Sequence, residues 1–120
     1  MRRFILVIAV LPLLLLSRAP AFAHAHLERA SPAVGSTVAA APKEVVLWFS
    51  EKLEPAFSTI EVRDAKGGAV QVGKATIDGD RTQLRVRLKA LGPGTYKVIW
   101  RVLSMDTHRT QGDFGFTVGK

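Results

Sequence analysis

Apolar and polar residues alternate along much of the chain beyond residue 43. Apolar side chains recur at every second position, which is the period of a β-strand and not that of a helix. In the segment 84–88, leucine and valine alternate with two arginines, which predicts one face in the core and one in solvent. In 44–50, both faces carry apolar residues and are expected to be at least partly buried. The segments with this pattern are 44–50, 60–63, 84–88, 96–103 and 114–118.

Residues that favour turns separate these strands. Glycine, proline and aspartate gather at 64–68, 78–80 and 92–94. Short strands at this spacing are typical of a β-sandwich or a β-barrel. Because no linker and no internal repeat is visible, the pattern predicts one all-β domain of about seven strands, packed as a Greek-key β-sandwich.

The first 23 residues have the order of an export signal. Arg2 and Arg3 precede an apolar run at 4–16, and residues 21–23 (Ala-Phe-Ala) form a small-x-small cleavage site. The run is shorter than the roughly 20 residues that a membrane span requires. We therefore predict that 1–23 is a signal peptide removed after export, and that 24–120 is a periplasmic domain that does not span the membrane. A short anchor that stays attached is the alternative.

A second cleavage site overlaps the first. Residues 23–25 (Ala-His-Ala) also have the small-x-small pattern. Cleavage after Ala23 makes His24 the N-terminal residue, whereas cleavage after Ala25 removes His24 and makes His26 the N-terminal residue. Both sites remain open from the sequence.

Composition and charge exclude several classes of protein. The chain has 120 residues and a formal net charge of +7, and removal of 1–23 leaves 14 basic and 10 acidic residues, a net charge of +4. The basic residues form no run and no face interleaved with aromatic residues, so a nucleic-acid partner is not expected. With no cysteine, a disulfide framework, a thiolate zinc site and a cysteine nucleophile are excluded.

The three histidines of the chain lie close to its two ends. His24 and His26 flank the second cleavage site, and His108 lies far downstream. An N-terminal His24 can chelate a metal through its α-amino group and its imidazole, whose pKa values are about 7.7–8.0 and about 6.5. In an extended segment, the side chains of residues 24 and 26 point to the same side, so His26 can add an imidazole.

Asp106 and His108 form a second pair of metal-binding side chains. They follow the apolar segment 96–103 at positions i and i+2, so an extended backbone places both on one side. A set of amine and imidazole nitrogens with one carboxylate and no sulfur suits Cu(II). Met105, next to Asp106, is expected to point to the opposite face and into the core.

Four segments resemble the CopC family of periplasmic copper-binding proteins. They cover nearly all of the predicted mature chain, and the most specific is the run Tyr-x-Val-x-Trp-Arg-Val-x-Ser-x-Asp-x-His at 96–108. The other parts of the resemblance are His-Ala-His-Leu-Glu-Arg-Ala-Ser-Pro at 24–32, the segment 40–51 with its Phe-Ser-Glu, and the segment 112–118.

This resemblance implies a fold and a metal site. The fold is an all-β, Greek-key, cupredoxin-like or immunoglobulin-like sandwich or barrel. The site holds one Cu(II) ion per chain, bound by the amine and imidazole of His24, by Asp106 and by His108, with His26 as a further ligand in members that begin His-x-His. Because 57–80 contains no methionine and no histidine, the Cu(I) site of some members is not expected here.

The resemblance also implies a function without catalysis. We expect a copper carrier or buffer in copper homeostasis and resistance, which hands copper to an inner-membrane transporter of the CopD type. Two alternatives belong to other classes. One is a copper-dependent oxidative enzyme with a histidine brace, similar to lytic polysaccharide monooxygenases, and the other is an immunoglobulin-like structural module that needs no metal.

Overall fold

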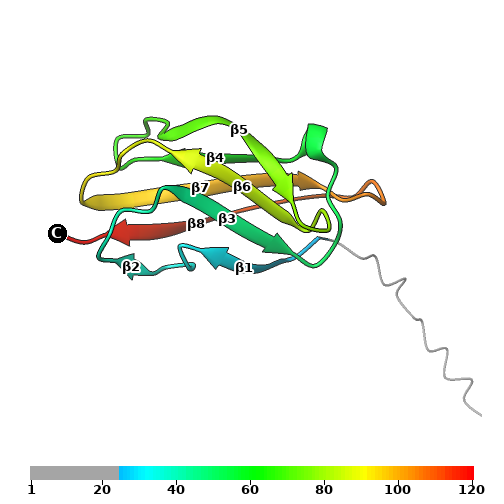
Figure 1. The fold of residues 1–120 in the computed structure, drawn as a ribbon, viewed down its shortest axis with the longest axis horizontal. Coiled ribbons are helices and arrows are strands. Elements are labelled where there is room, and N and C mark those ends of the chain that lie inside the picture. Colours follow the sequence, from blue (N-terminus) through cyan, green and yellow to red (C-terminus); the bar gives the residue numbers. More distant parts are fainter. Residues whose placement is uncertain (1–24) are drawn as a thin grey trace, which may run out of the picture.

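The computed structural model describes residues 25–120, which form a domain of strands (Figure 1). The signal peptide and His24 lie outside the described residues. The one helical element of the described part is a short 3-10 helix, and none of its helices is long and apolar enough to cross a membrane. The elements are β1 (Leu27–Ser31), β2 (Thr37–Val38), β3 (Glu44–Phe49), η1 (Pro55–Phe57), β4 (Thr59–Arg63), β5 (Gln71–Asp78), β6 (Gln83–Leu88), β7 (Gly94–Leu103) and β8 (Arg109–Val118).

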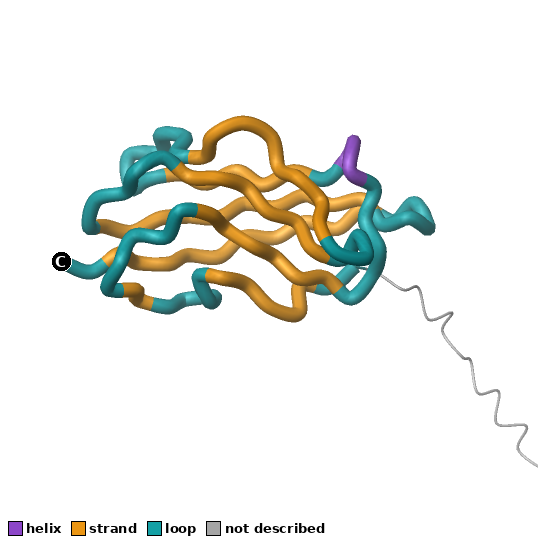
Figure 2. The backbone as a smooth tube through the Cα atoms, viewed as in Figure 1, coloured by secondary structure: helices purple, strands orange, loops and turns teal. Residues whose placement is uncertain are grey.

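The strands form two sheets of four that pack face to face (Figure 2). One sheet has the order β1-β3-β6-β5 and the other the order β2-β8-β7-β4. The chain crosses between the sheets after β1, β2, β3, β4 and β6, so many spatial neighbours are distant in sequence. The predicted Greek-key β-sandwich is confirmed. The sheets form a sandwich and not a closed barrel, and β2, with only two residues, brings the number of strands to eight.

The core lies between the two sheets and is built by the predicted alternation. The inward positions of β7 are buried from Tyr96 to Val102, whereas Lys97 and Arg101 face solvent. In β3, residues of both faces are buried, as the sequence predicts. The rings of Phe49 and Trp100 join the two sheets in an edge-to-face contact with centroids 5.2 Å apart. Phe49 is the last residue of β3, and Trp100 lies three residues before the end of β7, so this contact lies toward the ends of both strands.

A glycine in β8 makes room for the Trp100 ring. Gly112 is the register partner of Trp100, and a Cβ atom at Gly112 would lie 2.5 Å from Cζ2 and 2.9 Å from Cε2 of the indole. Real Cβ atoms do not approach other atoms this closely, so the indole and a side chain at 112 compete for one volume. Gly115 in the same strand has no such conflict, because its nearest neighbour would be the Tyr96 carbonyl oxygen at 3.5 Å.

Gly112→Ala is therefore expected to destabilise the domain by about 1–3 kcal/mol, the usual cost of overpacking a core. Urea-induced unfolding followed by Trp fluorescence measures this cost. Gly115→Ala is the matched control and is expected to change the free energy of unfolding little. Equal stability of the two variants would contradict the role assigned to Gly112.

Candidate metal centre

The turn between β7 and β8 carries two of the predicted metal ligands. β7 ends at Leu103 and β8 begins at Arg109, so the turn spans 104–108. The Ser104 N–H donates to the His108 carbonyl oxygen at 2.9 Å, and the Thr107 N–H donates to the Ser104 carbonyl oxygen at 2.9 Å. Thr107 has a φ of 72°, in the left-handed region. These bonds define a three-residue hairpin loop that ends in a left-handed residue.

Asp106 and His108 meet within this turn. Nδ1 of His108 lies 3.2 Å from Oδ2 of Asp106, and both side chains are partly exposed. The sequence pattern predicted that an extended backbone places the two side chains on one side. That reason is wrong, because β7 ends at Leu103, before both residues. The left-handed Thr107 reverses the chain between the two residues and brings the side chains together instead.

Ser104 is a member of the site that the sequence did not identify. It is only 1% exposed, and its hydroxyl lies within hydrogen-bonding distance of Oδ1 of Asp106. The hydroxyl oxygen of Ser104 also lies 3.3 Å from the His108 backbone nitrogen, from which it accepts a hydrogen bond. One buried hydroxyl therefore holds the carboxylate of Asp106 and the backbone of His108. One sequence signal could have identified Ser104. It is a polar residue at the next inward position after Val102, where the alternation of β7 would place an apolar side chain.

The Ser104 hydroxyl lowers the pKa of Asp106. Its hydrogen bond to the carboxylate is the largest cause of a pKa below the ordinary value of Asp106. Loss of hydration opposes this shift, and the His108 imidazole adds to it. Because the folded pKa lies below the unfolded one, the interaction stabilises the fold at pH values above the unfolded pKa. That stability is lost as the pH falls through the folded pKa.

Ser104→Ala is expected to raise the pKa of Asp106 toward its ordinary value, because the main hydrogen bond to the carboxylate is lost. An NMR titration of the side-chain carboxyl carbons measures it. Thr82→Ala is the matched control, since the Thr82 hydroxyl donates to Asp80 at 2.6 Å and lowers the pKa of Asp80 in the same way. The control should raise the pKa of Asp80 alone. An unchanged pKa of Asp106 in the Ser104→Ala variant would exclude the role assigned to the Ser104 hydroxyl.

The start of the described chain is fixed beside this turn. Ala25 is 1% exposed, and its carbonyl oxygen accepts a hydrogen bond from Oγ1 of Thr110 at 2.9 Å. Thr110 lies on β8, two residues after His108. Figure 1 shows the start of β1 at the same end of the sandwich as the β7–β8 turn. The residue that follows His24 is thus held at the end that carries Asp106 and His108.

His26 has a different environment. Its backbone N–H donates to Oγ of Ser50 at 2.8 Å, and its carbonyl oxygen accepts from the Ser50 N–H at 2.9 Å. These bonds connect His26 to the segment after β3, which belongs to the sheet opposite that of β7 and β8. The side chain of His26 is exposed. Across residues 25–120, no three histidine, aspartate or glutamate side chains are gathered closely enough to hold a metal ion. Of the four predicted ligands, the described part brings together Asp106 and His108.

Met105 does not enter the core. It is 45% exposed, and its Sδ accepts a hydrogen bond from Nη1 of Arg81 at 3.6 Å. Its N–H donates to the Lys52 carbonyl oxygen at 2.9 Å. The prediction of a buried Met105 is wrong because the alternation of β7 ends at Leu103, and the turn directs the next residues by its own geometry.

The described part is a two-sheet β-sandwich that carries a carboxylate and an imidazole in contact on one terminal turn. Residues 27–119 match the CopC domain, and the chain belongs to the CopC family. Its resemblance to this family is thereby confirmed, together with a copper-related function. Membership in a family of copper-binding resistance proteins also confirms the expectation of a protein that is not an enzyme.

Three relatives match this chain over most of its length, and two of them bear names connected with copper. Copper resistance protein C of Xanthomonas campestris pv. juglandis is 38% identical over 110 residues, which cover 86% of each chain. Protein YobA of Escherichia coli K12 is 40% identical over 99 residues, 81% of this chain and 80% of YobA. Copper transport protein CutJ of Bacillus subtilis is 34% identical over 101 residues, 82% of this chain but 19% of CutJ.

Solved structures agree with the fold. CopC from Methylosinus trichosporium OB3b superimposes with a TM-score of 0.75 at 39% identity, over 80% of this chain and 94% of that one. PcoC, a methionine-rich copper resistance protein from Escherichia coli, gives a TM-score of 0.70 at 34% identity, over 80% of this chain and 99% of PcoC. The sandwich described here is therefore the fold of copper resistance proteins of this family.

Proposed function

We propose that residues 24–120 form a periplasmic copper carrier that holds one Cu(II) ion at the β7–β8 turn. His24 supplies its α-amino nitrogen and its imidazole, Asp106 a carboxylate and His108 a second imidazole. The observation that carries the proposal is the contact of 3.2 Å between Asp106 and His108 at one end of the sandwich. Nitrogen ligands with one carboxylate oxygen suit Cu(II) better than Cu(I), which prefers sulfur.

The anchoring of Ala25 supports His24 as a ligand. Adjacent Cα atoms are about 3.8 Å apart across a trans peptide bond, so a fixed Ala25 limits how far His24 can lie from the β7–β8 turn. A ligand restricted in this way loses less conformational entropy when the metal binds. His26 is a further ligand in the proposal, although less supports it, because its backbone is paired with Ser50 in the other sheet.

The direction of copper transfer is also proposed. We infer that the carrier hands its ion to an inner-membrane transporter of the CopD type. The match to a part of copper transport protein CutJ supports a role beside a transport protein. The partial exposure of Asp106 and His108 supports it too, since an ion held at such a turn is open to a partner.

A Cu(II) titration of the secreted protein tests the site. Intact mass first establishes whether the chain begins at His24. The secreted protein is expected to bind one equivalent tightly, and a variant with one extra residue before His24 is expected to lose tight binding, because its α-amino group is displaced. Equal binding by both proteins would remove the amine from the site. Absence of tight binding by either would contradict the carrier function.

Copper affinity is expected to fall as the pH decreases from about 7 to about 5. Protons compete with Cu(II) for the amine and the imidazoles, whose ordinary pKa values are about 7.7–8.0 and about 6.5. A competition titration against a chelator of known affinity at each pH measures the change. An affinity that stays constant over this range would argue against nitrogen ligands.

A further inference from the structure

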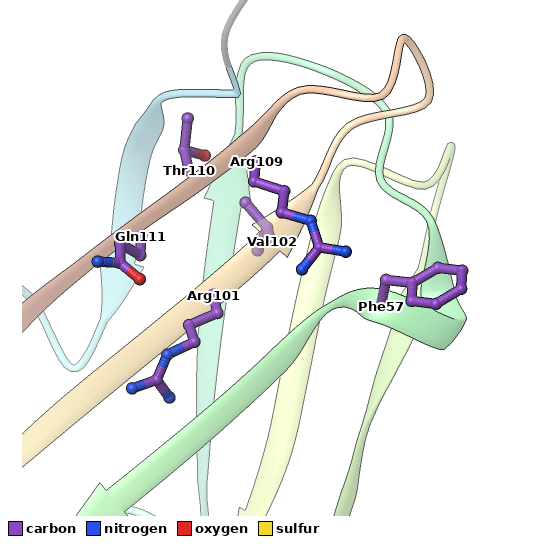
Figure 3. A pocket seen from close by; sticks show the side chains of 6 residues that line it. All are labelled: Phe57, Arg101, Val102, Arg109, Thr110 and Gln111. Carbon is purple, nitrogen blue, oxygen red and sulfur yellow. The ribbon is translucent and has the colours of Figure 1, made fainter.

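A hollow with two arginines lies on the outer side of the sheet β2-β8-β7-β4, next to the proposed copper site. We call it the arginine hollow. It encloses about 320 Å³ and is lined by Phe57, Arg101, Val102, Arg109, Thr110 and Gln111. Figure 3 shows the Arg109 side chain reaching from β8 toward the Phe57 ring, with Arg101 on the neighbouring strand. Arg109 directly follows His108, so the hollow and the turn share one end of the molecule.

The positive charge of the arginine hollow is poorly neutralised. Arg101 has one distant partner, with Nη1 lying 3.9 Å from Oε1 of Glu61. Glu61 also pairs with Arg63 at 3.1 Å, so one exposed carboxylate serves two guanidinium groups. Within residues 25–120, no carboxylate lies within ion-pair distance of Arg109. A guanidinium group favours planar anions, and a carboxylate can accept two of its N–H groups at once.

An exposed aromatic side chain completes the arginine hollow. Phe57 is the last residue of η1, and its ring is 60% exposed and open to an occupant of the hollow. Aromatic residues and arginine are the types that are enriched at protein interfaces. The hollow therefore offers two cationic groups and one apolar ring to the same occupant.

We propose that the arginine hollow docks an acidic segment of a protein partner. Carboxylates of the segment pair with Arg101 and Arg109, and an apolar side chain of the segment packs on Phe57. The identification of this partner as the one that exchanges copper rests on the proposed function, because only then does docking beside His108 serve a transfer. The docking surface itself rests on the two guanidinium groups and the exposed Phe57 ring, and not on the copper site.

The charges elsewhere on this sheet favour a protein segment over an anionic membrane. Lys97 faces Asp113 at 3.8 Å, and Arg63 faces Glu61 at 3.1 Å. The outer face therefore carries mixed charges, and its excess of positive charge is local to the arginine hollow. A membrane surface attracts a broad basic face, whereas two arginines around one hollow match a few carboxylates.

NMR spectra of the isotope-labelled secreted protein test the docking surface. The probe is a capped peptide, Asp-Leu-Asp-Phe-Asp, and its control has asparagine at each aspartate. The acidic peptide is expected to shift the signals of Phe57, Arg101, Arg109 and Gln111. The double variant Arg101→Gln, Arg109→Gln should weaken binding roughly two- to thirtyfold, the sum of two exposed ion pairs. Lys66→Gln with Lys89→Gln removes the same charge at two exposed positions outside the hollow, neither of which pairs with Glu61, and should leave the affinity unchanged.

Three results would overturn the docking surface. The first is an equal response to the asparagine peptide, and the second is equal weakening by the two double variants. The third is arginine-dependent binding to vesicles of phosphatidylcholine and phosphatidylglycerol without binding of the peptide, which would assign the hollow to a membrane. A Cu(II) titration of the Arg101→Gln, Arg109→Gln variant separates the two proposals, since one equivalent should still bind. If the unaltered protein binds the peptide but not copper, the docking surface is supported and the carrier function is rejected.

Discussion

The pairing of β7 with β8 is the interaction on which the rest of the molecule depends. The two strands are in register over ten pairs, from Gly94 with Val118 to Leu103 with Arg109. Their inward side chains form much of one half of the core, and the contact of Trp100 with Phe49 joins this half to the other sheet. Because the hairpin runs the length of the sandwich, its turn projects at one end as a rigid extension of the core (Figure 2).

Ser104 connects the core to the two side chains proposed to bind metal, Asp106 and His108. It occupies the next inward position after Val102, yet it is polar and fully buried. A buried hydroxyl requires hydrogen-bond partners, and this one finds them in the Asp106 carboxylate and the backbone of His108. The need to satisfy one polar group therefore fixes the turn and lowers the pKa of the carboxylate. The stability of the turn and the geometry of the proposed metal site thus depend on the same hydrogen bonds.

The sequence predicted the fold better than it predicted the site. Alternation in β3, β4, β6, β7 and β8 is strong because one or both faces of these strands enter the core. β5 escaped detection because its residues are mostly exposed, and β2 is too short to have a period. At the turn, the directions of the side chains depend on the left-handed backbone of Thr107, which an alternating pattern does not encode. Met105 was therefore predicted to be buried, although it is exposed. The proximity of Asp106 and His108 was predicted, although for a reason that the backbone does not support.

At one end of the sandwich, a proposed metal ligand and an exposed cationic side chain are adjacent in sequence. Where the chain leaves the turn and enters β8, the half-buried His108 is followed by the exposed Arg109. His108 is the last residue of the turn and Arg109 the first residue of β8, and the arginine hollow is lined by Arg109 and not by His108. A partner that pairs its carboxylates with Arg109 does not need to displace Asp106 from His108. The proposed copper site and the proposed docking surface can therefore be occupied together at the same end, because the two interactions use separate side chains.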